Sequence, residues 1–127
     1  MGPKSKAKSP RPPTQEIGED VLTKVTALKN EGNKCFAKRD YESALEQYET
    51  AAQLLPEAAP ERVDLICNRA ACYYQMKRFK DAAKECTSAL ELNPSSAKAL
   101  QRRARSLEQQ GLYKQALADI QAVNRWV

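Results

Sequence analysis

Apolar and polar positions alternate with a helical period along most of this chain. Within residues 32–56, apolar side chains recur at separations of three and four, which places them on one face of a helix. Short turn segments interrupt the pattern, and their sequences are KRDY, MKRF and QGLY. The pattern predicts an all-α fold in which each turn joins two amphipathic helices.

The helical pattern is repeated. Residues 32–56 align with residues 70–94 so that their prolines coincide, and residues 104–126 form a third copy in the same register. The copies begin 38 and then 34 residues apart, and the four extra residues lie in LLPEAAPER, where proline prevents a helix from continuing. Repeated helix-turn-helix units are therefore expected at about residues 25–58, 63–96 and 97–127.

Each unit has small residues where its two helices should cross. An aromatic residue ends the turn, an alanine follows three positions later, and a third residue four positions further on should fill the space beyond. These are Tyr41, Ala44 and Tyr48; Phe79, Ala82 and Cys86; and Tyr113, Ala116 and Ile120. A glycine inside a helix, such as Gly32, costs about 1 kcal/mol relative to alanine. Because Ala70 and Ala104 occupy the equivalent positions, we expect smallness to be what this position requires.

The unit has a small residue at position eight, alanine at twenty, an aromatic at twenty-four and proline at thirty-two, and it resembles the tetratricopeptide repeat (TPR). The resemblance covers roughly residues 25–127 and departs at Cys35, Cys86 and Ile120, where aromatic residues are usual. It implies a right-handed superhelical stack of three TPR units. The first helix of each unit would line a concave face that binds extended peptides.

Five polar residues occupy particular register positions on the predicted first helices. They are Lys29, Asn33, Asn68, Lys98 and Arg102. Together they resemble, residue for residue, the carboxylate clamp of TPR co-chaperones. That resemblance implies binding of the C-terminal EEVD sequence of the seventy- and ninety-kilodalton heat-shock chaperones. Any one of them alone fits a solvated helix face equally well, so the hypothesis depends on the complete set.

The chemistry of the set suits a peptide that ends in aspartate, because such a residue carries two carboxylates. Lysine and arginine supply charge-assisted hydrogen bonds, and asparagine supplies neutral donors that add no further charge to desolvate. Phe36, Ala71 and Tyr74 are expected to form an apolar pocket for the preceding valine, and Arg105 to contact an upstream glutamate. For Phe36, Tyr74 and Arg105, ordinary surface or packing roles are equally consistent with the sequence.

The net charge of +5 is concentrated at the N-terminus, where Lys4, Lys6, Lys8 and Arg11 precede residue 14. The composition predicts a disordered, basic tail over residues 1–20, followed by the TPR domain over residues 21–127. A solvated tail is favoured over a nucleic-acid or nuclear-targeting segment.

The cysteine and hydropathy patterns argue against a metal-binding, secreted or membrane-spanning protein. The four cysteines form no CxxC pair and the chain has no histidine, so neither a metal site nor a cofactor is expected. Reduced thiols are predicted, with Cys35 and Cys86 buried. No segment approaches the roughly 18 apolar residues of a membrane span, and no signal peptide is visible. A cytoplasmic protein is expected, with the nucleus as the alternative.

Three other functions compete with the clamp hypothesis. An enzyme is disfavoured because the sequence has no histidine, phosphate-binding loop or nucleophile motif, and no small-molecule substrate is expected. A helical-repeat RNA binder would use the basic tail and QRRARS at residues 101–106, but the units share no recurring pair of base-reading side chains. A TPR scaffold that binds a different peptide remains the nearest alternative.

Overall fold

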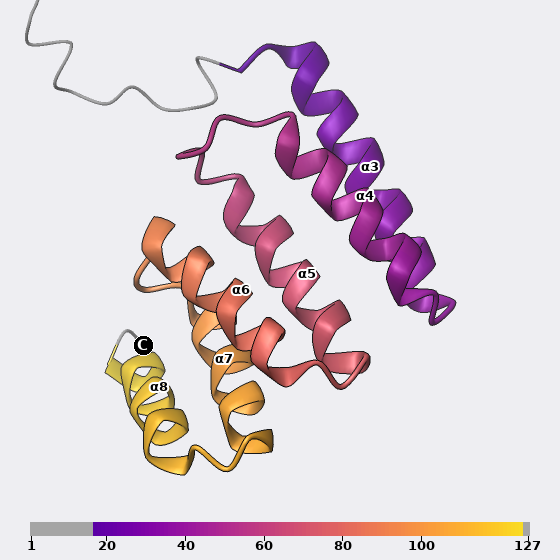
Figure 1. The fold of residues 1–127 in the computed structure, drawn as a ribbon. Coiled ribbons are helices and arrows are strands. Elements are labelled where there is room, and N and C mark those ends of the chain that lie inside the picture. Colours follow the sequence, from indigo (N-terminus) through magenta and orange to yellow (C-terminus); the bar gives the residue numbers. More distant parts are fainter. Residues whose placement is uncertain (1–16, 126–127) are drawn as a thin grey trace, which may run out of the picture.

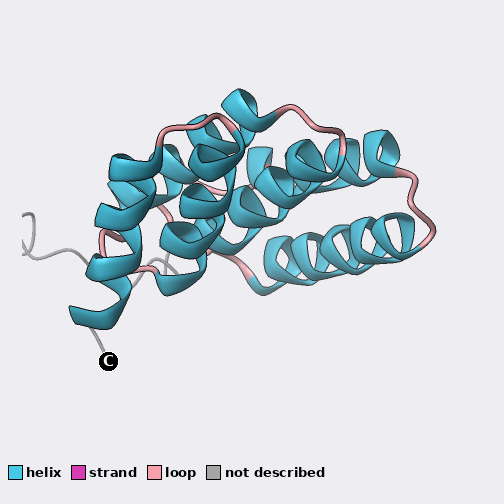
Figure 2. Cartoon of the chain, turned by 90° about the horizontal axis from the view of Figure 1, so that it is seen from below, coloured by secondary structure: helices cyan, strands magenta, loops and turns pink. Residues whose placement is uncertain are grey.

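The computed structural model describes residues 17–125, and what was expected of residues 1–16 lies outside this range. The helices are α3 (Glu19–Ala37), α4 (Tyr41–Gln53), α5 (Arg62–Gln75), α6 (Phe79–Leu92), α7 (Ala97–Gln109) and α8 (Tyr113–Arg125). No strand occurs within the described range (Figure 2). The all-α prediction is confirmed.

The helices form a linear stack in chain order. Each helix packs against the next, and α5 also contacts α7, which brings the first helices of two successive units together. Helices α3 and α4 lie at one end of the stack and α8 lies at the other (Figure 1). The helices pair as three helix-turn-helix units, as the repeat predicted. None of the described helices is long and apolar enough to cross a membrane.

The first helix starts earlier than the sequence pattern predicted. Helix α3 begins at Glu19, and Ile17 is buried in the first core cluster, so the predicted tail boundary at residue 20 is wrong for residues 17–20. Glu19 and Asp20 lie in the first turn, where acidic side chains interact favourably with the helix dipole. The buried Ile17 anchors the chain immediately before the helix.

The three turns share one backbone conformation. Arg39, Lys77 and Gly111 have φ angles of 65°, 62° and 78°, the left-handed region that glycine adopts most readily. They are spaced by the same 38 and 34 residues as the sequence repeats. At the start of the third unit, the Ser96 hydroxyl caps α7 by accepting a hydrogen bond from the Ala99 backbone N–H at 3.2 Å. Equivalent turns therefore start each second helix in the same way.

Small residues separate the paired helices as expected. Ala44 and Ala82 are completely buried, and a β-carbon built on Gly32 would lie 2.6 Å from Cε1 of the Tyr48 ring. This is closer than van der Waals contact allows, so Gly32 is required by the Tyr48 ring. The prediction that Ile120 fills the equivalent space is wrong, because its side chain is 47% exposed. Ile120 lies on α8, the last helix of the described stack, so no later helix within the described range covers it.

The cysteines are distributed differently from the prediction. Cys86 is fully buried as expected, but Cys35 is only partly buried, whereas Cys67 and Cys72 are fully buried. Burial raises the pKa of the Cys72 and Cys86 thiols to about 12 and also raises the pKa of Cys67. Cys72 lies on a face of α5 that packs against other helices, and the sequence pattern could not distinguish this buried face from an exposed one.

We expect Cys35 to be the only one of the four thiols that reacts quickly in the folded protein. A thiolate is the reactive species, and the other three thiols are inaccessible and have raised pKa values. Labelling with an aromatic disulfide at mildly alkaline pH, followed by peptide mass spectrometry, measures the rate at each site. Cys35→Ser should abolish the fast phase. Rapid labelling of Cys67, Cys72 or Cys86 without denaturant would contradict the expected burial.

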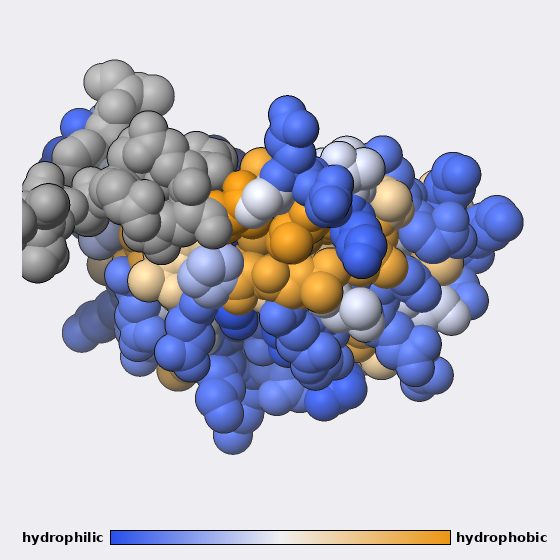
Figure 3. All heavy atoms as spheres, turned by 90° about the horizontal axis from the view of Figure 1, so that it is seen from above, coloured by the Kyte–Doolittle hydropathy of each residue, from blue (hydrophilic) through white to orange (hydrophobic). Residues whose placement is uncertain are grey.

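Seen from above, hydrophobic side chains gather in the middle of the face, and hydrophilic side chains lie below them and to their right (Figure 3). The first core cluster includes Leu55 and Ala59 from the connection between α4 and α5, and Leu54 beside them is 40% exposed. Leu55 and Ala59 of LLPEAAPER therefore pack against the first unit.

Candidate functional site

Helices α3, α5 and α7 line two adjoining hollows. Both hollows include Phe36 from α3, Ala71 from α5 and Arg102 from α7. The first also has Ala70, Tyr74, Gln75, Arg105 and Ser106, and the second has Asn33, Ala37, Tyr48 and Asn68. Seven of the nine residues proposed from the sequence therefore line one continuous groove. The expectation that the first helix of each unit forms this face is met.

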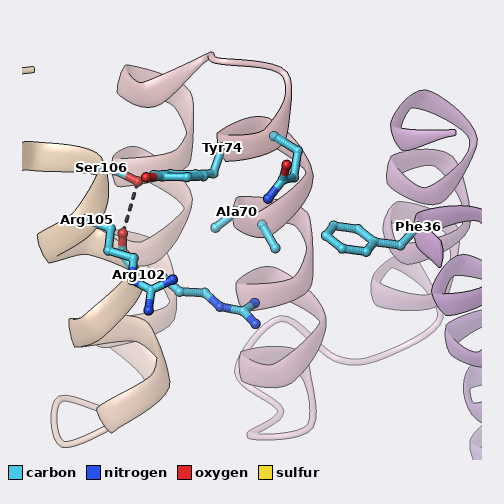
Figure 4. Close-up of a pocket in the computed structure, with 8 residues that line it drawn as sticks. Phe36, Ala70, Tyr74, Arg102, Arg105 and Ser106 are labelled. Carbon is cyan, nitrogen blue, oxygen red and sulfur yellow. Dashed lines mark hydrogen bonds between the residues drawn. The ribbon is translucent and has the colours of Figure 1, made fainter. Parts of the chain in front are cut away.

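The first hollow combines apolar side chains with two guanidinium groups. Phe36 points into it from α3, opposite Tyr74 of α5, and Ala70 lies between them (Figure 4). Arg102 and Arg105 approach from α7 (Figure 4). Phe36 and Tyr74 are each held by an edge-on aromatic contact, with Tyr41 and Phe79 respectively, at centroid distances of 5.1 Å. Such a hollow can take a small apolar side chain whose neighbours are anionic.

The two remaining predicted residues, Lys29 and Lys98, meet at a residue that the sequence pattern did not identify. Nζ of Lys29 donates to Oδ2 of Asp64 at 2.7 Å, and Nζ of Lys98 donates to Oδ1 of the same carboxylate at 2.5 Å. This bridge joins α3, α5 and α7. Burial opposes the ionisation of Asp64, but the hydrogen bonds from Lys29 and Lys98 outweigh it and hold its pKa below the ordinary value. Asp64 is thus an anion at neutral pH.

The side-chain amide of Asn33 is oriented by a tyrosine from the neighbouring helix. The Tyr48 hydroxyl donates to Oδ1 of Asn33 at 2.5 Å, so the amide N–H groups remain available to the groove. Burial is the main cause that raises the pKa of Tyr48 to about 12, and the nearby Cys72 adds to it. Tyr48 therefore remains a hydrogen-bond donor throughout the neutral range.

Arg102 is fixed by the backbone of α5. Its Nη1 donates to the carbonyl oxygen of Cys67 at 2.6 Å, immediately before Asn68 in the sequence. An arginine has five N–H donors, so this bond leaves others for a ligand. Because Arg102 lines both hollows, it can contact a ligand that spans them.

Sequence reasoning missed Asp64, the Tyr48 hydroxyl and the Cys67 carbonyl as parts of this site. One signal was available, because Asp64 precedes Asn68 by four residues and therefore lies one turn earlier on the same face of α5. The other two depend on contacts between helices, for which the repeat pattern contains no signal.

The sequence of the second unit, residues 63–96, matches the family model described as tetratricopeptide repeat. The solved structure of the first TPR domain of Spaghetti (RPAP3), bound to the HSP90 peptide SRMEEVD, superposes with a TM-score of 0.71 at 31% identity. The match covers 80% of this chain and 77% of that one. The chain belongs to the tetratricopeptide repeat family. The expected superhelical TPR stack is thereby confirmed.

Further proteins of known structure or function are similar to this TPR chain. The second TPR domain of human RPAP3, solved in complex with the HSP70 peptide SGPTIEEVD, has a TM-score of 0.72 at 28% identity and covers 81% of this chain and 82% of that one. Human mitochondrial import receptor subunit TOM70 is 39% identical over 117 residues, 90% of this chain and 19% of that protein. The HSP-interacting protein of Zea mays is 37% identical over 132 residues, 99% of this chain and 18% of that protein. The chain thus spans less than a fifth of these curated relatives.

Proposed function

We propose that this TPR domain is a protein-interaction module of the co-chaperone type. Its ligand would be the C-terminal EEVD-like tail of the seventy- and ninety-kilodalton heat-shock chaperones. The observation that carries the proposal is the arrangement of five polar side chains on three successive first helices. Asn33, Asn68 and Arg102 line the groove, and Lys29 and Lys98 meet at Asp64. Two TPR domains of similar structure were solved with peptides that end in EEVD.

In this proposal, Lys29, Lys98 and Arg102 bind the two carboxylates of the terminal aspartate. Asn33 and Asn68 donate neutral hydrogen bonds from the same groove. These side chains come from α3, α5 and α7, so a bound peptide would lie across the first helices. The free chain terminus is the discriminating feature, because an internal aspartate carries only one carboxylate.

The neighbouring hollow has the chemistry expected for the rest of the tail. Phe36, Ala71 and Tyr74 supply the apolar surface for the valine side chain, and Arg105 lies at the edge where an upstream glutamate would pass. The four-residue motif would then use both hollows, with Arg102 between them.

The same proposal includes a binding role without catalysis and a cytoplasmic location. Family membership supports the first, since TPR units act in protein interaction. The location rests only on the proposed partners, because the relatives include a mitochondrial import receptor.

Calorimetric titration with SRMEEVD and SGPTIEEVD, each as the free acid and as the C-terminal amide, tests the proposal. We expect the free acid to bind at least about tenfold more tightly, a difference of about 1.4 kcal/mol, because amidation removes one of the two carboxylates. A peptide with the same residues in scrambled order is the control for net charge. Equal binding of acid and amide would instead indicate a scaffold that recognises internal segments. Tight, salt-sensitive binding of single-stranded RNA in place of the peptides would indicate the nucleic-acid alternative.

A further inference from the structure

Asp64 lies where an anionic ligand of the two lysines would bind. Each of its carboxylate oxygens accepts a hydrogen bond from a different ammonium group, that of Lys29 at 2.7 Å and that of Lys98 at 2.5 Å. In the free protein, therefore, a side chain of the domain itself pairs with two of the cations that the proposed clamp requires.

The bridge is open enough to be exchanged. The side chains of Lys29, Lys98 and Asp64 are 37%, 42% and 41% exposed. Ion pairs at such exposure contribute little to stability, because water screens them and ordering the long side chains opposes them. Stabilisation of the helix packing therefore does not explain why an aspartate occupies position 64.

Asp64 also changes the charge that a ligand meets. Lys29, Lys98 and Arg102 carry three positive charges, and Asp64, which is ionised at neutral pH, removes one of them. Any carboxylate that approaches the lysines must either displace Asp64 or share their N–H donors with it. Both routes reduce the net attraction, since like charges at this range repel.

We propose that Asp64 is a built-in competitor of the peptide carboxylate, a residue that lowers the affinity of the groove for acidic C-terminal tails. The inference rests on the proposed function and adds a residue that opposes it. The opposite role would be that of a positioning residue, which holds the two lysines ready for the ligand. Substitution distinguishes the two roles, because they predict opposite signs.

Asp64→Asn is the decisive variant, since asparagine keeps the shape and one hydrogen-bond acceptor but removes the charge. We expect it to bind free-acid SRMEEVD about fivefold or more tightly than the parent at low salt, the size expected for one unit charge about 4 Å away in water. The gain should shrink as salt is added, because salt screens exposed charges. Affinity of the variant should consequently fall more steeply with salt concentration.

Asp81→Asn is the matched control. Asp81 on α6 also forms an exposed ion pair, with Arg78 at 2.9 Å, and the same substitution raises the net charge by the same amount. Asp81 lines neither hollow of the groove. The affinity of Asp81→Asn should therefore stay within about twofold of the parent, because the substituted charge is exposed to water and does not contact the lysines. Circular dichroism of both variants checks that the fold is retained.

The outcomes separate this inference from the proposed function. If Asp64→Asn binds the free acid more tightly than the parent and Asp81→Asn does not, the competitor role is supported. Equal or weaker binding by Asp64→Asn, or an equal gain in both variants, overturns the competitor role. In that case, a preference of the parent for the free acid over the amide would still support the proposed function. If neither the parent nor Asp64→Asn binds the free acid, the proposed function fails and the competitor role fails with it.

Discussion

Replacing Arg102 by alanine should weaken binding of a free-acid EEVD peptide by about 2–5 kcal/mol, the range for removing one partner of a desolvated charge pair. Arg102 is expected to have the largest effect in the groove, because it lines both hollows and its side chain is held by the Cys67 carbonyl. Lys98→Ala should be less damaging, since Lys98 is already paired with Asp64 in the free protein.

Arg102→Ala should lower the affinity for the peptide but should change the free energy of unfolding only slightly. Arg102→Ala removes one hydrogen bond, worth about 0.5–1.5 kcal/mol, and alanine is a good helix former. Calorimetric titration gives the affinity and urea unfolding gives the stability of the same sample. Arg78→Ala is the matched control, because Arg78 is a partly exposed arginine whose pairs, with Asp81 and the Tyr73 ring, lie outside the hollows.

A double-mutant cycle connects this result to the peptide terminus. If Arg102 contacts the terminal carboxylate, amidation of the peptide should matter much less in Arg102→Ala than in the parent. If Arg102→Ala binds the free acid as tightly as the parent, the clamp assignment of Arg102 is wrong.

Replacing Gly32 by alanine should destabilise the folded protein, although alanine is favoured in helices by about 1 kcal/mol. The added methyl group would lie 2.6 Å from Cε1 of Tyr48, whose ring is almost completely buried. Overpacking of this kind costs about 1–3 kcal/mol. With the helix-propensity gain subtracted, we expect a net loss of up to about 2 kcal/mol in the free energy of unfolding by urea.

The second unit supplies a control for this prediction, because Ala70 and Cys86 occupy the positions of Gly32 and Tyr48. In a Tyr48→Cys background, Gly32→Ala should become neutral or stabilising, since the ring that opposes the methyl group is gone. In the parent, Gly32→Ala should also weaken peptide binding, because displacement of Tyr48 breaks its hydrogen bond to Asn33. A Gly32→Ala protein as stable as the parent would show that the ring moves aside without loss.

The repeat itself determined the helices and turns of this protein. Spacing at three and four residues places side chains on one face of a helix wherever that helix lies, so Asn33 and Phe36, three residues apart, share a face of α3. The alignment of the units also identified Gly32 as a position that requires a small residue. The tertiary structure supplies the reason, which is the Tyr48 ring.

The resemblance to the tetratricopeptide repeat also implied that residues from three separate helices would share one groove. This succeeded because equivalent positions in stacked repeats face the same side of the stack. Seven of the nine proposed residues line the two hollows, and Lys29 and Lys98 meet beside them. Their assignment to the chaperone tail remains a proposal.

Only the tertiary structure decided which groups touch across helices. The Asp64 bridge depends on the spacing of α3, α5 and α7, and the burial of Cys72 depends on the first core cluster. The exposure of Ile120 likewise depends on its place at the end of the described stack. The periodicity of a chain determines the faces of each helix, but the distance and rotation between helices depend on how all their side chains pack together.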